Sequence, residues 1–407
     1  MMKMRRGVLA AAVTAALLAA CGGGNPDPGG DGPSGAPSTV GSFTAVVSFG
    51  DSLSDVGTYS PATSLAGNGS SPYLGGKFTT NTDSSTGDLI WVERVAATLG
   101  ITITPADMGF AGQSQACPAA TINPALAGTC TAYGQGGSRV TDPEGIGHTK
   151  DGAPAALTVP VATQIDRHLE RFGSFKDSDL VIIWAGNNDA FIQLQTFVAT
   201  ATSIQTQVAT GAITAERGNK LLYDAQSAAQ EGMKEAAFEL AGYVKNKILA
   251  HGGKYVAIGN LPNSALTPQF QAYPASIQGV LKTITETFNL WLREGLDDLP
   301  VQIIDMASIG AAVNAAPASY GFTNITTPAC SATKISLITG GQITDGSSLF
   351  CNATTGMPYN GLSDGADTST WFFADGVHPT SGGHAYYADQ ILTQLRAFGW
   401  VAAPAAQ

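Results

Sequence analysis

Phe49-Gly50-Asp51-Ser52-Leu53-Ser54-Asp55-Val56-Gly57 follows a short apolar run at residues 44–48 and holds a serine just beyond a predicted strand. The pattern predicts a strand, a turn and a helix, with Ser52 at the helix N-terminus. A serine hydroxyl is a weak nucleophile that needs a general base and donors for the developing oxyanion. A helix N-terminus would add its free N–H groups and positive dipole end. The alternative interpretation is an ordinary Asp/Ser helix cap after a strand.

Two later stretches favour a nucleophile at Ser52. Residues 371–380, Trp-Phe-Phe-Ala-Asp-Gly-Val-His-Pro-Thr, place Asp375 and His378 three residues apart, so that both can lie in one short turn. The histidine could then act as base toward Ser52. In mid-chain, the apolar run 179–185 leads into Gly186-Asn187-Asn188-Asp189, which puts an amide donor just past a strand end.

These blocks resemble the GDSL lipase/esterase family of the SGNH hydrolases, and the resemblance covers roughly residues 43 to 396. In chain order the blocks are Gly50-Asp51-Ser52-Leu53, Gly134-Gln135-Gly136-Gly137-Ser138-Arg139-Val140, Gly186-Asn187-Asn188-Asp189 and Asp375-Gly376-Val377-His378. The resemblance implies Ser52 as nucleophile, His378 as base and Asp375 as its support. It also implies an oxyanion hole made by Ser52, Gly137 and Asn188.

The second block departs from the family pattern at one position. The family often has an asparagine five residues before the donor glycine, and that position here is Ala132. The departure leaves Gly136 and Gly137 as alternative donors, and the register favours Gly137. Arg139 in the same block is expected to form a structural salt bridge.

Composition and charge bound the function. The chain has 407 residues, 44% of them hydrophobic, and a formal net charge of −11 with only 20 lysines and arginines. The length permits a large core, and we expect one catalytic domain with loop insertions over residues 43–400. The scarcity of cations argues against nucleic acid as a partner, because phosphate neutralisation provides the affinity of such complexes.

The N-terminus predicts export. Residues 1–21 combine Lys3, Arg5 and Arg6 with an apolar run and end in Leu18-Ala19-Ala20-Cys21, which is typical of a secretory signal with a bacterial lipobox. Cys21 would be the acylated N-terminus, anchoring the protein to a membrane, with Gly22 favouring the outer one. A plain cleaved signal, giving a periplasmic or secreted protein, is the alternative. Residues 22–42 are predicted to be a flexible tether rich in glycine, proline and serine.

The remaining cysteines fall in two local pairs, Cys117 with Cys130 and Cys330 with Cys351. In a chain sent to an oxidising compartment, both pairs are predicted to be disulfides that close loops. A zinc site is the rival interpretation, but neither pair has the spacing of a zinc ligand pair.

Alternating apolar runs and helical periodicity predict an α/β protein with a parallel sheet and helices on both faces. The family resemblance implies the three-layer α/β/α sandwich with a parallel, flavodoxin-like sheet of the SGNH hydrolase fold. We expect strands at 44–48, 101–104, 179–185, 255–258 and 301–304, and helices at 89–99, 163–172, 190–250, 278–296 and 383–398. Residues 109–133 are expected to be a loop, and residues 315–367 an insertion forming a lid or wall. Aromatic residues such as Tyr73, Phe78 and Trp91 could touch substrate, although packing is the commoner role.

The predicted reaction is acyl transfer from a small-molecule or lipid ester to water, without metal or organic cofactor. The chain lacks the G-x-S-x-G stretch of an α/β-hydrolase elbow. Phospholipase, acyltransferase and carbohydrate O-deacetylase activity remain alternatives at the same site, as does a catalytically silent surface binding protein. The sequence does not address the oligomeric state.

Overall fold

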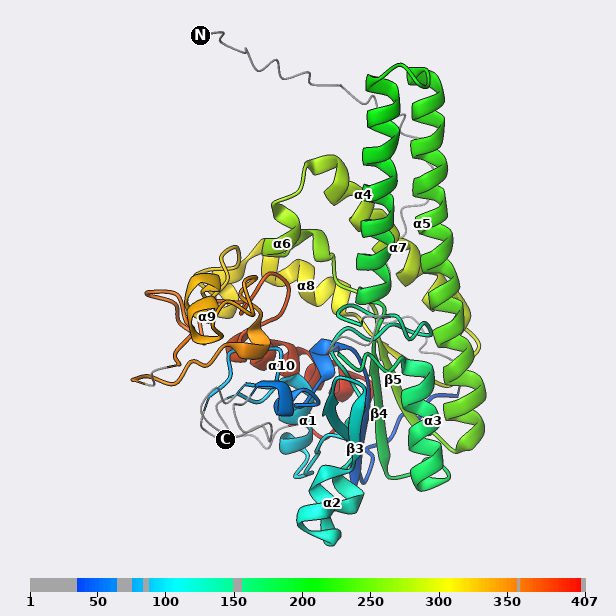
Figure 1. The fold of residues 1–407 in the computed structure, drawn as a ribbon. Helices are drawn as coiled ribbons and strands as arrows, with labels where there is room; N and C mark the ends of the chain where they lie inside the picture. Colours follow the sequence, from blue (N-terminus) through cyan, green and yellow to red (C-terminus); the bar gives the residue numbers. More distant parts are fainter. Residues whose placement is uncertain (1–34, 64–74, 83–87, 149–155, 357–358, 404–407) are drawn as a thin grey trace. The chain divides into compact units, whose positions relative to one another are not determined.

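A computed structural model of the protein describes residues 35–63, 75–82, 88–148, 156–356 and 359–403 (Figure 1). Within these residues the central sheet is parallel, with the strand order β1-β4-β5-β6. The strands are β1 Ala45–Gly50, β4 Asp179–Trp184, β5 Tyr255–Gly259 and β6 Gln302–Ile304. The first three are buried almost throughout, as expected for parallel strands covered on both faces.

The register separates the two faces of the sheet. Phe49 pairs with Ile183, and Ile183 pairs with Ile258, so these three side chains point to one face. Trp184 lies in the next row and points to the opposite face. A Cβ on Gly259, the partner of Trp184, would lie 3.0 Å from the indole, so the missing side chain makes room for the tryptophan.

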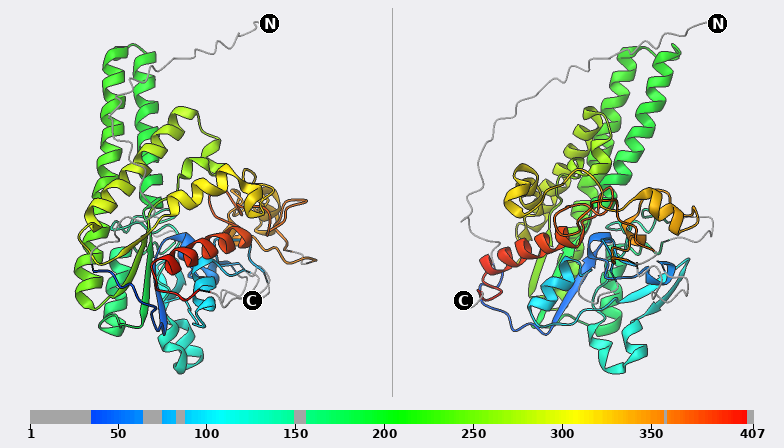
Figure 2. Two further views of the ribbon diagram at one scale, coloured as in Figure 1. Left: turned by 180° about the vertical axis from the view of Figure 1, so that it is seen from behind. Right: turned by 90° about the vertical axis from the view of Figure 1, so that its left-hand side faces the viewer.

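Helices cover both faces, which makes the fold a three-layer α/β/α arrangement (Figures 1 and 2). On one face, Trp184 contacts Trp91 and Tyr387, which lie on α1 Trp91–Thr98 and α10 Ser381–Ala397. On the other, Phe49 contacts His168 of α3 Val161–Phe172. The further helices are α2 Pro118–Ile122, α6 Pro268–Gln271, α7 Ala275–Leu296, α8 Met306–Ala315 and α9 Ala332–Ile338.

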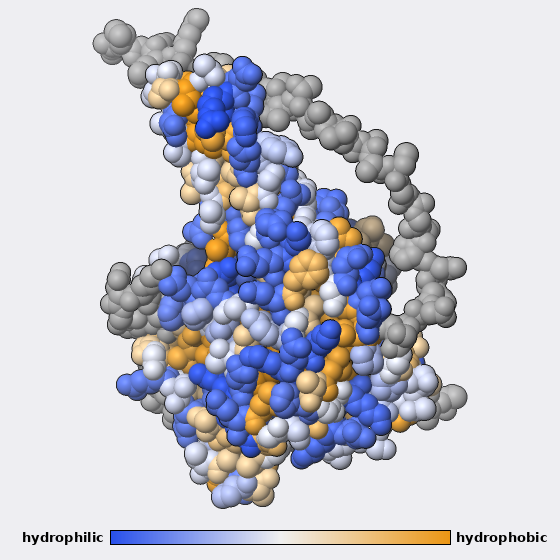
Figure 3. Space-filling model, turned by 90° about the vertical axis from the view of Figure 1, so that its right-hand side faces the viewer, coloured by the Kyte–Doolittle hydropathy of each residue, from blue (hydrophilic) through white to orange (hydrophobic). Residues whose placement is uncertain are grey.

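A long antiparallel hairpin is formed by α4 Asn187–Ala209 and α5 Ala215–Tyr243 (Figure 1). The C-terminal half of α5 packs on α7, while the distal part of the hairpin extends away from the sheet (Figure 2). On the face drawn in Figure 3, hydrophobic residues lie interspersed with hydrophilic ones along the hairpin. None of the helices in the described ranges combines the length and the apolar character that crossing a membrane requires.

The end of the predicted tether contacts the domain. The Trp400 indole Nε1 donates to the Pro37 carbonyl over 2.6 Å, and the Gly41 amide donates to the Trp400 carbonyl over 2.9 Å. Cys21 and residues 22–34 lie outside the described residues.

Two expectations about local structure are wrong. Residues 101–104 do not form a strand, because the position beside β1 is taken by residues 131–133, which exchange backbone hydrogen bonds with Ser48. The predicted loop at 109–133 contains the hairpin of β2 Asp107–Phe110 and β3 Gln113–Ala116, followed by α2. Its turn residues, Ala111 and Gly112, both have positive φ, as tight hairpin turns require.

Gly186, which links β4 to α4, provides a test of this arrangement. Its φ is +114°, and a Cβ there would lie 2.7 Å from the Phe288 ring on α7. Gly186→Ala is therefore expected to lower the free energy of unfolding by about 2–4 kcal/mol, because backbone strain and overpacking add. Chemical denaturation measures the change.

Gly211, at the tip of the hairpin, is the matched control for the Gly186 variant. Its φ is +73°, but its Cβ would meet open space. Gly211→Ala should therefore cost only the backbone term, about 1–2 kcal/mol. Equal losses in the two variants would show that the contact with Phe288 is not what constrains residue 186.

Candidate active site

The turn after β1 places Ser52 at the carboxyl edge of the sheet. Asp51 caps a three-residue 3-10 helix, Ser52–Ser54, by accepting from the Leu53 amide over 3.0 Å. The predicted helix after the turn is thus wrong: one 3-10 turn is too short to supply a helix dipole. The turn is instead fixed by Gln164 of α3, which accepts from the Gly50 amide and donates to the Gly50 carbonyl.

The loop before α10 brings His378 and Asp375 to this turn. His378 Nε2 lies 2.8 Å from Ser52 Oγ, and His378 Nδ1 lies 2.8 and 2.9 Å from the two oxygens of Asp375. A carboxylate only accepts, so Nδ1 carries the proton and Nε2 is left to accept from the serine hydroxyl. This is the arrangement that activates a serine for nucleophilic attack.

The Asp375 carboxylate stays ionised although it is buried. Burial raises its pKa, but the charge and hydrogen bond of His378 and a hydrogen bond from Ser348 outweigh it, so that the pKa falls below its usual range. The Ser348 amide donates to one carboxylate oxygen over 2.9 Å, and the Val377 and His378 amides donate to the other. The carboxylate is therefore both charged and fixed in orientation.

Three of the residues predicted to bind the oxyanion, Ser52, Gly137 and Asn188, line the same cavity. The Gly136 amide donates to Asp55 over 2.9 Å, whereas no hydrogen bond of the Gly137 amide is found within the described residues. This difference favours Gly137 over Gly136 as donor, in agreement with the register. Asn188 Nδ2 donates to the Ser138 carbonyl over 2.8 Å, and its second N–H is left for a substrate.

Residues 46–391 match the sequence profile of the family described as GDSL-like lipase/acylhydrolase. The chain belongs to this family. It is therefore placed among the hydrolases that act on acyl esters. No curated protein sequence matches the chain. Among solved structures, it is similar to an extracellular lipase from Streptomyces rimosus, with 13% identity and a TM-score of 0.38, covering 86% of this chain and 99% of the lipase.

The second and third GDSL-family blocks are tied together by an ion pair. Arg139 Nε donates to the Asp189 carboxylate over 2.9 Å, and the Val140 amide donates to the other oxygen over 3.0 Å. Arg139 thus forms the predicted structural salt bridge. The ion pair holds residues 134–140, here called the glycine loop, beside the N-terminus of α4, where Asn188 lies.

Asp55, two residues after the first GDSL-family block, has a role that the sequence does not reveal. Its buried carboxylate accepts from the amides of Gly57, Thr58 and Gly136, and so fastens the serine turn to the glycine loop. Burial outweighs these hydrogen bonds and raises the pKa of Asp55 to about 6. Burial likewise raises the pKa of Asp51 to about 6. The only sign of this role in the sequence is a carboxylate three residues after the serine. A carboxylate at that position is equally typical of a helix cap.

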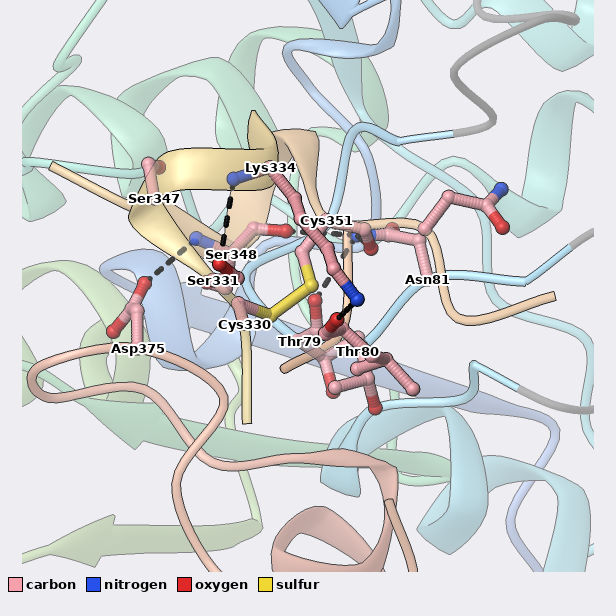
Figure 4. The surroundings of a disulfide bond; sticks show 12 residues. Thr79, Thr80, Asn81, Cys330, Ser331, Lys334, Ser347, Ser348, Cys351 and Asp375 are labelled. Atoms are coloured by element: carbon pink, nitrogen blue, oxygen red, sulfur yellow. Dashed lines mark hydrogen bonds between the residues drawn. A yellow bond between two sulfur atoms is a disulfide. The ribbon is translucent and has the colours of Figure 1, made fainter. Parts of the chain in front are cut away.

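The insertion at 315–367 forms one wall of the site, as expected. Figure 4 shows its disulfide and the hydrogen bond between Ser348 and Asp375. The Cys330–Cys351 disulfide closes a loop inside this insertion, and the Cys330 amide donates to the carbonyl of Ala374, the neighbour of Asp375. Ser348, which donates to Asp375, lies three residues before Cys351. The other predicted disulfide, Cys117–Cys130, is also present and staples α2 to the rest of the domain.

A cavity of about 970 Å³ opens over Ser52 and His378. Phe78 lines it, and its ring lies 4.8 Å from the His378 ring, whereas Trp91 is buried in the core. Tyr73 lies outside the described residues. The described residues contain no group of three or more histidine, cysteine or acidic side chains that could hold a metal ion.

The disulfide of the insertion generates one prediction. Replacing Cys330 and Cys351 by alanine should lower kcat/KM for an ester by about tenfold or more, because the loop that holds Asp375 loses its anchor. The matched control is the double alanine variant of Cys117 and Cys130, in which kcat/KM should change less than about twofold. Thermal unfolding checks that both variants are folded. Equal losses in the two variants would contradict a specific role for Cys330–Cys351.

Asp55 generates a second prediction, on the pH dependence of stability. Its pKa is about 6 in the folded chain and 3.8 when unfolded, so the folded chain binds more protons between these values and loses stability as the pH rises. Asp55→Asn removes this loss. The stability of wild type relative to Asp55→Asn should therefore fall by about 2 kcal/mol between pH 4 and pH 7. Urea unfolding at several pH values measures it, and a difference that is constant with pH would contradict it.

Proposed function

We propose that the chain is an exported serine ester hydrolase of the carboxylesterase or lipase type. The observation that carries this proposal is the hydrogen-bonded series Ser52, His378 and Asp375, with 2.8 Å between Ser52 Oγ and His378 Nε2. The family profile supports hydrolysis of acyl esters in general. A large cavity beside the serine supports a substrate larger than a short ester.

In the proposed reaction Ser52 Oγ attacks the ester carbonyl while His378 Nε2 takes its proton. The tetrahedral intermediate collapses when His378 returns the proton to the leaving alcohol, which leaves an acyl-serine. Water, deprotonated by the same nitrogen, then attacks the acyl carbon and releases the acid and the free serine. Asp375 orients the imidazole and stabilises its charged form throughout.

The oxyanion of this intermediate would be bound by the amides of Ser52 and Gly137 and by Asn188 Nδ2. These three groups come from the serine turn, the glycine loop and the first turn of α4. Preorganised donors of this kind stabilise charge that develops only in the transition state. The reaction needs no metal or organic cofactor.

Export and lipidation at Cys21 complete the proposal. The two disulfides support passage through an oxidising compartment. Mass spectrometry of the mature protein should find a chain that begins at Cys21 and carries acyl groups. A mature chain that begins elsewhere, or an unmodified Cys21, would contradict lipidation. The protein would then be a periplasmic or secreted enzyme and not an outer-membrane lipoprotein.

Substitution of the catalytic residues tests the reaction. Ser52→Ala and His378→Ala should each lower kcat for p-nitrophenyl esters by about 10⁴-fold or more, since the pair acts as one unit. Asn188→Ala should lower kcat by about 10²-fold, the usual effect of one missing oxyanion donor. Thermal unfolding of Ser52→Ala should remain close to wild type.

The exposed residues His251 and Ser203 provide matched controls, because neither lines the cavity. His251→Ala and Ser203→Ala should retain wild-type kcat. Full activity in Ser52→Ala would refute the nucleophile. If wild type hydrolyses no ester in the series and a fluorophosphonate probe does not label Ser52, the chain is a silent binding protein.

A further inference from the structure

One face of α4 extends the cavity away from the serine. The helix begins at Asn187 and Asn188, and the cavity is also lined by Phe191, Leu194, Gln195 and Val198. Residues spaced by three or four lie on one face of a helix, so these side chains form a single row that starts at the oxyanion asparagine. Apart from Gln195, which is exposed, the row beyond the asparagines is apolar.

The opposite wall is partly apolar, because Asn263, Ser264, Thr267 and Gln269 also line the cavity there. It comes from η6 Ser264–Leu266 and from α6 with the turn that follows it, through Leu266, Phe270 and Tyr273. The ring centroids of Phe191 and Phe270 lie 4.9 Å apart, so α4 and α6 are in contact through these two rings. The Gln269 amide donates to the Gly376 carbonyl over 2.9 Å, so this wall is fixed to the loop that carries His378.

The groove changes from buried to open along its length. Leu194 and Phe270 are 3% and 4% exposed, whereas Tyr273 is 39% exposed. Val198 is half-buried, and beyond it residues 199 and 200 of α4 are exposed. An apolar groove that starts at the oxyanion site and ends at the surface suits a hydrocarbon chain attached to the reacting carbonyl.

The direction of the groove assigns it to the acyl part of the ester. In the tetrahedral intermediate the leaving oxygen must face His378 Nε2, which protonates it, so the acyl chain points away from the histidine. The row on α4 starts from Asn188, on the oxyanion side. Phe78, whose ring contacts His378, lies instead on the side of the leaving group.

Distances along α4 also indicate how long a hydrocarbon chain the groove accommodates. Leu194 is six residues and Val198 ten residues beyond Asn188, or roughly 9 and 15 Å along the helix axis. An extended hydrocarbon advances about 1.3 Å per bond, because bonds of about 1.5 Å are joined in a zigzag. The groove therefore accommodates roughly seven carbons as far as Leu194 and roughly twelve as far as Val198.

On these grounds we propose that the groove between α4 and α6 binds the acyl chain of the substrate and selects medium-chain esters of roughly eight to twelve carbons. The inference rests on the proposed serine hydrolase function. Because each methylene that enters an apolar site favours binding of the transition state, kcat/KM should rise up to about fourfold per methylene until the groove is filled.

The test compares kcat/KM for p-nitrophenyl acetate, butyrate, octanoate, decanoate and palmitate, all below the concentrations at which they aggregate. In wild type, kcat/KM should be highest between octanoate and laurate. The laurate ester is added to the series if kcat/KM still increases from octanoate to decanoate. Val198→Trp fills the outer groove and should lower the decanoate-to-acetate ratio about tenfold or more. Leu194→Trp should move the maximum to still shorter chains. Because Leu194 is buried, this variant is not essential: if it does not fold, Val198→Trp, at a half-buried position, is sufficient for the test.

Thr196→Trp is the matched control, because Thr196 is exposed and lies on α4 outside the cavity lining. Its profile should equal that of wild type. A decanoate-to-acetate ratio that is unchanged in Val198→Trp, or a wild-type profile that falls steadily from acetate, would overturn the inference. Decyl acetate checks the direction: a loss in Val198→Trp confined to this ester would assign the groove to the alcohol part.

Failure of the inference and failure of the proposed function give different results. Hydrolysis of p-nitrophenyl acetate that depends on Ser52, with no chain-length preference, would overturn the acyl groove alone. Absence of hydrolysis for every ester, together with absence of labelling at Ser52, would overturn both.

Discussion

The hydrogen bond between Ser52 and His378 joins residues 326 positions apart, and the rest of the site is arranged to keep it at 2.8 Å. The two side chains lie on a turn after the first strand and on a loop before the last helix. A single 3-10 turn at Ser52 and an irregular loop at His378 cannot fix the two side chains by themselves. The bond therefore depends on the parallel sheet, whose strands all end at one edge, and on hydrogen bonds that anchor each loop to that edge.

Each anchor comes from a different part of the chain. Gln164 fixes the Gly50 peptide, Asp55 fixes the glycine loop, and the Ser348 amide fixes Asp375. Most of these bonds are buried, and a buried bond is stronger because little water competes for its partners. Buried carboxylates are a cost of this arrangement, seen in the raised pKa of Asp51 and Asp55, near 6 in each case. Asp375 avoids that cost because His378 and several backbone amides donate hydrogen bonds to it.

Two segments, the insertion at 315–367 and the α4–α5 hairpin, act on the same edge in different ways. The segment at 315–367, closed by Cys330–Cys351, braces the loop of Asp375 and His378 through backbone hydrogen bonds. The α4–α5 hairpin begins at Asn187 and Asn188 and carries a mostly apolar row along the cavity. The insertion thus holds Asp375 beside His378, while the hairpin lines the cavity next to Ser52.

The sequence by itself determined the features that depend on residues close together along the chain. Apolar runs gave four strands, helical periodicity gave most helices, and the four short blocks gave the family and the residues that meet at the site. Local patterns did not decide which segment takes the place beside β1, where residues 131–133 exclude the strand expected at 101–104. They also missed Asp55, because a carboxylate after a serine looks the same whether it caps a helix or binds a glycine loop 81 residues away. Pairing partners, buried anchors and the course of the groove were decided only by tertiary structure, because they depend on contacts between segments whose separation along the chain carries no local signal.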